Sequence, residues 1–240
     1  MALVEEQTSV VGQRVVDIGG GRGYFAEAFR RAGAASVLVE PFREAMGGSG
    51  RRLGYGLIGD GRALPFVDGA FDISHSSNVL EHVVGPAAFL DEMVRVVRPG
   101  GLVFLAFTNW LSPFGGHETA PWHYLGGEMA ARRYEWKHGH PPKNRYGEAL
   151  FKLHISDVLA LVEMRTDVAV IDAYPRYYLR WARPVMKMPG LREVATWNLV
   201  IMMRRRIQAA TPERPVHRAQ QALHRTHQAI PENSPTSIHA

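Results

Sequence analysis

An aspartate followed by evenly spaced glycines near the start of the chain has the residue types needed to hold a small polar ligand. Asp17 precedes Gly19, Gly21 and Gly23 in the pattern Asp-x-Gly-x-Gly-x-Gly. Glycines allow a tight turn and let a ligand lie against the main chain. A carboxylate at this place would repel a pyrophosphate, so the pattern favours a ligand that carries an amino group and no phosphate.

Two further acidic positions continue this pattern. Glu40 ends the apolar stretch 36–39, at the place where nucleotide-binding α/β proteins hold ribose hydroxyls, although an ordinary carboxylate at a strand end is the alternative. Asp60 and Gly61 follow a third short apolar stretch. Asp17 lies near the end of the first predicted strand, and Glu40 lies at the end of the second.

The elements that position these residues alternate between strand and helix patterns. The glycine turn lies between a predicted strand over 15–18 and a helix over 24–32, whose free N–H groups would point at the ligand. Later helices are predicted over 86–97 and 156–164, the second with Ser156 as its N-cap. Further strands are predicted over 36–39, 71–75, 102–107, 168–173 and 196–203. This alternation indicates an α/β fold with a parallel sheet.

Several longer motifs follow the glycine turn in a continuous series. They include Gly-Asp-Gly-Arg-Ala-Leu-Pro-Phe at 59–66, Val-Leu-Glu-His-Val at 79–83 and Arg-Pro-Gly-Gly at 98–101. From residue 17 to 107 the chain resembles the class I S-adenosylmethionine (SAM) methyltransferases, of the methyltransferase type 11-like branch. The stretches 110–118 and 123–127 look like those of uncharacterised actinobacterial and mycobacterial members. The resemblance implies an α/β Rossmann-like sandwich with a seven-stranded, mostly parallel sheet and an antiparallel last strand.

The resemblance also implies the cofactor, S-adenosyl-L-methionine, with S-adenosyl-L-homocysteine as product. Asp17 would face the amino-acid part of SAM directly or through water, Glu40 would hold the ribose, and Asp60 would accept from the adenine amino group. The turn after the fourth strand would lie beside the transferred methyl group. The cofactor-binding residues implied in this way are Asp17, Gly19, Gly21, Gly23, Glu40, Asp60, Gly61, Ser77 and Asn78.

Residues 108–150 break the motif series and are rich in histidine, tryptophan and glycine. We expect a substrate-facing lid at the carboxyl edge of the sheet, with a self-packed aromatic loop as the alternative. His117, His123 and the strand-end His75 are candidate catalytic bases, although a strand-end histidine is more often structural. Glu81 and His82 are predicted to serve in helix capping and packing. The spacing of histidines and acids matches no standard metal motif, so no metal site is predicted.

These features predict a SAM-dependent methyltransferase acting on a small-molecule or lipid or glycolipid acceptor, with O-methylation favoured. One alternative is an NAD(P)-dependent Rossmann oxidoreductase, which Asp17 and the stretch around Asp60 disfavour. The other is a non-catalytic SAM-fold binding protein, suggested by the dozen or so residues that precede the first strand, where this class usually carries covering helices.

The composition of the chain excludes several kinds of site and binding partner. The 240-residue chain has no cysteine, which excludes disulfides, thiolate metal sites and cysteine nucleophiles. Its positive charge lies mostly in six arginines from residue 204 onward, so residues 1–203 are nearly neutral, and the predicted domain over 1–206 has no specific nucleic-acid surface. Residues 207–240 are predicted to be a basic, disordered tail. No export signal or membrane span is evident, so a cytoplasmic protein is expected, with weak contact of residues 174–191 at the inner membrane face left open.

Overall fold

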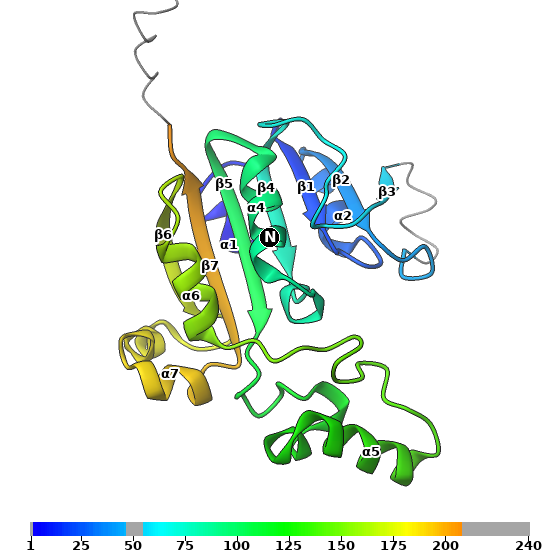
Figure 1. Ribbon diagram of the computed structural model, residues 1–240. Coiled ribbons are helices and arrows are strands. Elements are labelled where there is room, and N and C mark those ends of the chain that lie inside the picture. The colour runs from blue at the N-terminus through cyan, green and yellow to red at the C-terminus, as the bar shows by residue number, and fades with distance from the viewer. Residues whose placement is uncertain (1, 47–54, 208–240) are drawn as a thin grey trace, which may run out of the picture. The chain divides into compact units, whose positions relative to one another are not determined.

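The computed structural model describes residues 2–46 and 55–207, and the residues up to Arg206 form one compact unit. Its centre is a seven-stranded sheet with the strand order β3-β2-β1-β4-β5-β7-β6 (Figure 1). The strands are β1 (Arg14–Ile18), β2 (Ala35–Glu40), β3 (Gly56–Ile58), β4 (Phe71–Ser77), β5 (Val97–Thr108), β6 (Val168–Pro175) and β7 (Asn198–Arg205).

The direction of the strands confirms the predicted topology. Neighbouring strands from β3 to β5 run parallel, whereas β7 lies antiparallel between β5 and β6. The register sets Asp17 of β1 beside His75 of β4. The carboxyl ends of β1, β2 and β4 therefore meet at one edge, where ligands bind in sheets of this kind.

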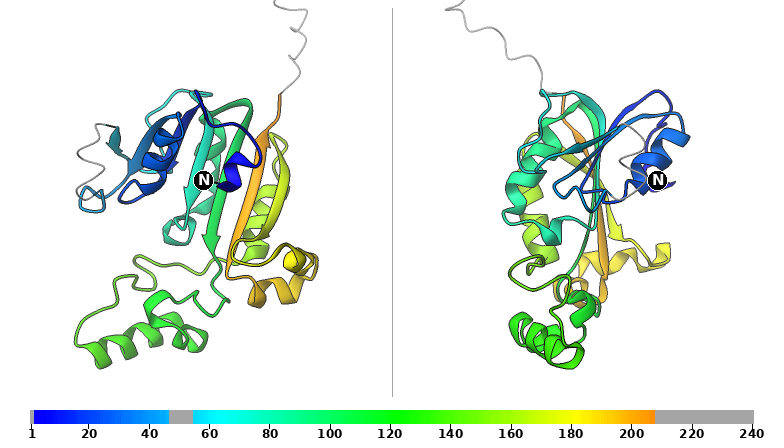
Figure 2. Two further views of the ribbon diagram at one scale, coloured as in Figure 1. Left: turned by 180° about the vertical axis from the view of Figure 1, so that it is seen from behind. Right: turned by 90° about the vertical axis from the view of Figure 1, so that its right-hand side faces the viewer.

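Helices cover both faces of the sheet. They are α1 (Ala2–Glu5), α2 (Tyr24–Arg31), α4 (Pro86–Arg95), α5 (Gly127–His138), α6 (Ile155–Glu163) and α7 (Pro189–Ala195). Phe89 of α4 and Val158 of α6 join one apolar core, and Val4 of α1 and Phe29 of α2 join the other. The side view shows these two layers on opposite faces (Figure 2). Burial of these apolar side chains stabilises the sandwich, by about 1.5–3 kcal/mol for each large side chain.

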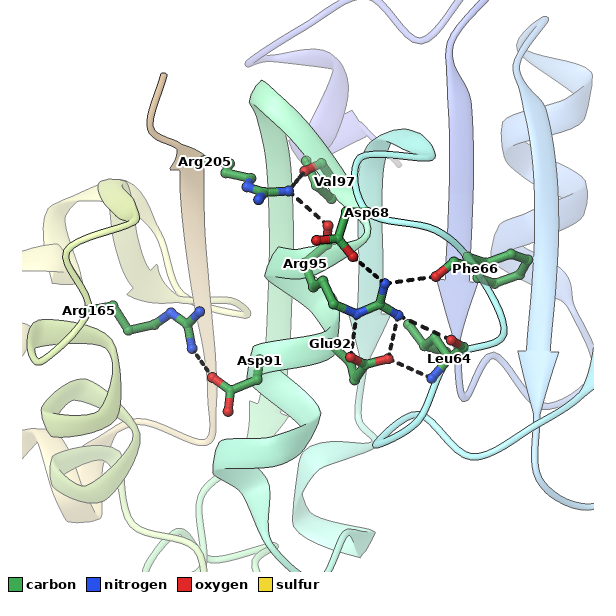
Figure 3. Close-up of polar contacts among 9 residues, drawn as sticks. All are labelled: Leu64, Phe66, Asp68, Asp91, Glu92, Arg95, Val97, Arg165 and Arg205. Carbon is green, nitrogen blue, oxygen red and sulfur yellow. Dashed lines mark hydrogen bonds and ion pairs between the residues drawn. The ribbon is translucent and has the colours of Figure 1, made fainter. Parts of the chain in front are cut away.

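Arg95 of helix α4 forms hydrogen bonds and an ion pair with the segment 64–68, which precedes β4. Figure 3 shows the Arg95 guanidinium between the carboxylates of Glu92 and Asp68, with the carbonyls of Leu64 and Phe66 accepting from its remaining N–H groups. Glu92 in turn accepts from the backbone N–H of Leu64 at 2.6 Å. This network fixes the path of the chain that leads away from Asp60.

The insertion after β5 differs from the predicted loop. It contains two short 3-10 turns, η2 (His117–Thr119) and η3 (Trp122–Leu125), followed by the twelve-residue helix α5. The sequence shows no apolar period there because α5 buries only glycine and alanine, at Gly127, Ala130 and Ala131. The insertion lies beyond the carboxyl ends of the parallel strands (Figure 1).

The cap of helix α6 also differs from the prediction. Helix α6 begins at Ile155, and its first N–H groups are bound by the carboxylate of Glu193 from α7, not by the predicted cap Ser156. Beyond Ile207, the predicted tail lies outside the described residues. Within residues 2–46 and 55–207, no helix is long and apolar enough to cross a membrane.

Candidate functional site

The glycine turn joins β1 to α2 in backbone conformations that favour glycine. Gly19, Gly21 and Gly23 have φ values of 72°, 54° and 78°. A Cβ on Gly20 would lie 2.1 Å from a carboxylate oxygen of Asp17, which packs under the turn. A Cβ on Gly21 would meet none of the described atoms within 4 Å. The turn is therefore closed from below by Asp17 and open above Gly21, where a ligand can approach the main chain.

The position of Asp17 differs from the expected contact with the amino-acid part of the cofactor. Its side chain is 1% exposed, and its two oxygens bind the backbone N–H of Ala26 and Nδ1 of His75, the latter at 2.8 Å. Because both oxygens face inward, Asp17 holds the turn and the start of α2 in place. Its influence on a ligand is through the shape of the turn.

Glu40 lies at the carboxyl end of β2, against the same turn. Its Oε2 accepts from the N–H of Gly21 at 3.0 Å, and its Oε1 accepts from the N–H of Phe42 at 3.4 Å. Burial raises the pKa of Glu40, and these two N–H groups oppose that effect. A carboxylate oxygen carries two lone pairs, so Glu40 keeps acceptor capacity for hydroxyl groups beside Gly21.

Asp60 and Gly61 border an open pocket next to the glycine turn. The chain passes so close to the core at Gly61 that a Cβ there would lie 2.3 Å from the ring of Phe89. Only glycine, which has no Cβ, fits at this position. Asp60 is 47% exposed and is held by the Arg62 guanidinium, whose hydrogen bond lowers the pKa of Asp60. The pocket is lined by Ile18, Gly19, Pro41, Phe42, Asp60, Gly61, Arg62, Val79, His82, Val83, Val84, Phe89, Glu148 and Phe151. Mostly apolar walls beside the carboxylate of Asp60 suit a flat ring that bears an amino group.

Ser77 and Asn78 lie together at the carboxyl end of β4, as expected for a turn beside the reacting groups. Asn78 has a φ of 60°, and its amide donates to Thr108 Oγ1 at 3.0 Å. Arg176, which follows β6 and had no predicted role, also lies at this edge. Its guanidinium donates to Ser77 Oγ at 2.6 Å and to Asn78 Oδ1 at 3.3 Å. This edge therefore carries a positive charge in addition to the predicted polar groups.

The three predicted bases have different surroundings. His75 is buried between the rings of Phe25 and Phe104 and binds Asp17. His123 is also buried, and its Nε2 contacts the carbonyls of Trp110 and Ser112.

A base must reach the proton that it removes. The expectation that His75 and His123 act as bases is therefore corrected: both serve in packing and positioning. Burial also lowers the pKa of His123. His117 is half-buried, and its ring meets the ring of His82 with centroids 5.1 Å apart.

Glu81 and His82 are the site residues that sequence reasoning missed. Glu81 does not cap its own short turn η1 (Leu80–His82) but accepts from the backbone N–H of Thr108 at 3.1 Å. His82 lines the pocket that contains Gly19 and Asp60. The motif Val-Leu-Glu-His-Val was a signal of their importance, but not of their proximity to His117, which comes from the insertion.

The glycine turn, Glu40 and the Asp60 pocket together fit a nucleoside with an amino-acid part. Hydroxyl acceptors at Glu40 and an amino acceptor at Asp60 match the ribose and the adenine of SAM. The space above Gly21 matches a ligand portion that lies directly on the main chain.

Comparisons with known proteins agree with this fit. A methyltransferase domain family model matches residues 16–105. An uncharacterized methyltransferase from Mycolicibacterium vanbaalenii is 47% identical over 200 residues, which are 82% of this chain and 78% of that protein.

Solved structures show the same fold. A SAM-dependent methyltransferase from Mesorhizobium loti has a TM-score of 0.61 at 20% identity, covering 85% of this chain and 96% of that one. The [4+2]-cyclase SpnF has a TM-score of 0.55 at 14% identity, covering 86% and 79%.

The domain match and the close relative exclude the nicotinamide oxidoreductase considered from the sequence, and the cofactor is S-adenosylmethionine. The protein belongs to the S-adenosylmethionine-dependent methyltransferases.

Proposed function

We propose that the protein transfers a methyl group to a hydroxyl oxygen of a hydrophobic small-molecule, lipid or glycolipid acceptor. The observation that carries the proposal is the place of His117. The insertion brings this histidine against His82 at the rim of the cofactor pocket, where the acceptor would lie. Because a hydroxyl group must lose a proton during methylation, the acceptor needs a polar group beside it at the rim of the pocket.

SAM supplies an electrophilic methyl group on a sulfonium. The acceptor oxygen would attack the methyl carbon in line, forming an O–C bond as the C–S bond breaks, with S-adenosylhomocysteine leaving as a neutral thioether. The protein contributes alignment. Glu40 and the glycine turn would fix the nucleoside, and Ser77 and Asn78 would border the reacting groups. The acceptor proton would leave from the side of the oxygen that faces His82 and His117.

The hydrophobic character of the acceptor is inferred from the insertion. Large apolar side chains lie exposed on it, and a soluble domain gains nothing from such exposure unless the surface binds something. Trp136, for example, is 82% exposed. The exposed apolar residues of the insertion are Phe114, Trp122, Tyr124, Leu125, Met129 and Trp136.

The test is a transfer assay with methyl-labelled SAM and an acceptor panel of hydroxylated lipids, glycolipids, phenols and fatty acids, with a peptide mixture and RNA as comparison. We expect label in an organic-soluble product that survives mild alkali, because ethers resist it and methyl esters do not. The Asp60→Ala variant should label more slowly at limiting SAM. Label only in peptide or RNA, or only in alkali-labile esters, would contradict the proposal.

A further inference from the structure

Two neighbouring side chains and a third that is distant in the sequence meet at the rim of the cofactor pocket. Glu81 and His82 come from the turn after β4, and His117 comes from the insertion. One carboxylate oxygen and one nitrogen from each imidazole all lie within 4.8 Å of one another. From this cluster we propose that Glu81, His82 and His117 bind a divalent transition-metal cation of the zinc type, which holds the oxygen of the methyl acceptor.

The state of Glu81 is the first argument. Its side chain is 1% exposed. Oε1 accepts from the Thr108 N–H, whereas Oε2 has no hydrogen-bond partner among the described residues. A buried carboxylate oxygen without a partner is costly, and a cation is the partner that such an oxygen binds best.

The hydrogen bonding of His82 is the second argument. Its Nδ1 lies 2.5 Å from the carbonyl oxygen of Ala149. A carbonyl only accepts, so Nδ1 carries the proton and Nε2 keeps its lone pair. Metal-binding histidines are commonly oriented in this way by a carbonyl or carboxylate on the other ring nitrogen.

The backbone of His117 is the third argument. Among the described residues, Asn78 and His117 are the non-glycine residues with positive φ, at 60° and 50°. Such conformations cost about 1–3 kcal/mol and persist where the surroundings require them, often at functional sites. Here the conformation belongs to the residue that brings the second imidazole to the cluster.

The ligand set predicts the kind of cation and its task. Two imidazoles and one carboxylate suit Zn²⁺, Co²⁺ or Fe²⁺ better than Mg²⁺, which prefers oxygen ligands. Ligand atoms around tetrahedral zinc lie about 3.3 Å apart, whereas those of the cluster lie within 4.8 Å of one another, so a side chain, which we take to be His117, would have to move inward by roughly an ångström. A 3.4 Å contact from its Nδ1 to the carbonyl of Gly115 would hold it only weakly against this movement.

Three protein ligands leave a coordination position for the acceptor. The cation would lower the pKa of the bound hydroxyl, whose proton would pass to water before the oxygen attacks the methyl carbon. The two imidazoles would then act as ligands and not as bases. This role rests on the proposed oxygen methylation, whereas the metal site itself does not.

The experiment is a titration of the metal-free full-length protein with Co²⁺, followed by visible absorption, with Zn²⁺ competition and with Mg²⁺ for comparison. We expect one tight equivalent, displaced by Zn²⁺ and not by Mg²⁺. His117→Ala and Glu81→Gln should each weaken Co²⁺ binding by at least about tenfold. The matched control is His138→Ala, which removes an exposed imidazole outside the cluster and should leave the tight equivalent unchanged.

S-adenosylhomocysteine binding, measured on the same samples, separates the two proposals and checks that each variant is folded. Binding of S-adenosylhomocysteine without a tight Co²⁺ equivalent would overturn the metal site and leave the methyltransferase function intact. So would a tight equivalent that survives in His117→Ala and Glu81→Gln but is lost in His138→Ala. A tight Co²⁺ equivalent without S-adenosylhomocysteine binding would support the site and contradict the proposed function.

Discussion

At the scale of single residues, the two acids at the ends of their strands, Glu40 and Asp60, differ in their environment. Glu40 is buried against the glycine turn, and burial raises its pKa. Asp60 is half-exposed, and the hydrogen bond from Arg62 lowers its pKa. An exposed ion pair is worth about 0–1 kcal/mol, so Asp60 can exchange Arg62 for the amino group of a ligand at little cost.

Asp60→Ala should therefore weaken the binding of S-adenosylhomocysteine by about tenfold, which corresponds to the loss of about 1.4 kcal/mol. Arg62→Ala should not weaken it, because the guanidinium competes for the same carboxylate. Calorimetric titration measures both, with Asp157→Ala on the exposed start of α6 as control. If Asp60→Ala and Arg62→Ala weakened S-adenosylhomocysteine binding equally, the ion pair would only stabilise the loop that contains both residues, and Asp60 would not contact the ligand.

The places of the residues in the glycine turn and at the strand ends could be predicted from the sequence, because they depend on local spacing. Glu40 and Asp60 do lie at the predicted edge of the sheet. The inward position of Asp17 and the contact between His82 and His117 could not be predicted. They depend on how β4 and a remote insertion pack, and no local pattern records that packing.

At the scale of elements, strands with unbroken apolar runs were predictable, and caps provided by remote residues were not. Helix α6 is the example. Its first N–H groups, at Ile155 and Ser156, are bound by the carboxylate of Glu193 at 2.9 Å and 2.8 Å. The residue preferences of helix N-caps predict Ser156 as the cap. In the structure, no side chain at the N-cap position of α6 forms a capping hydrogen bond.

Glu193→Ala should lower the free energy of unfolding by about 1–2 kcal/mol, because it removes two hydrogen bonds and a negative charge from a helix N-terminus. Ser156→Ala should change it by less than about 0.5 kcal/mol. Urea unfolding followed by circular dichroism compares the two. A larger loss for Ser156→Ala than for Glu193→Ala would show that the local cap is the one that matters.

The link between Arg95 and Glu92 predicts a pH dependence of stability. The hydrogen bond from Arg95 lowers the pKa of Glu92 below its ordinary value of 4.5. Its contribution is therefore complete above the unfolded pKa and is lost as the pH falls through the folded pKa.

Glu92→Gln should cost about 2 kcal/mol near neutral pH, and the difference from wild type should shrink as the pH falls from about 5 to about 3. Urea unfolding at a series of pH values checks this, with Glu163→Gln on the exposed end of α6 as control. A difference that stays constant across the series would rule out ionisation of Glu92 as its source.

At the scale of the whole molecule, the sheet brings the carboxyl ends of β1, β2 and β4 together, and the insertion after β5 lies beyond them. The cofactor pocket is built from elements that the sequence motifs identify. The proposed acceptor side would be built from the insertion, η1 and Arg176, whose arrangement depends on the complete fold. This division explains why the cofactor could be inferred from the sequence, whereas the acceptor is a proposal.

The central claim is that this edge of the sheet binds S-adenosylmethionine. Calorimetric titration of the wild-type protein with S-adenosylhomocysteine, with NAD as comparison, tests it most directly. We predict one site per chain with a dissociation constant on the order of micromolar for S-adenosylhomocysteine, and no binding of NAD. Absence of binding by S-adenosylhomocysteine, or equal binding of both nucleotides, would contradict the claim.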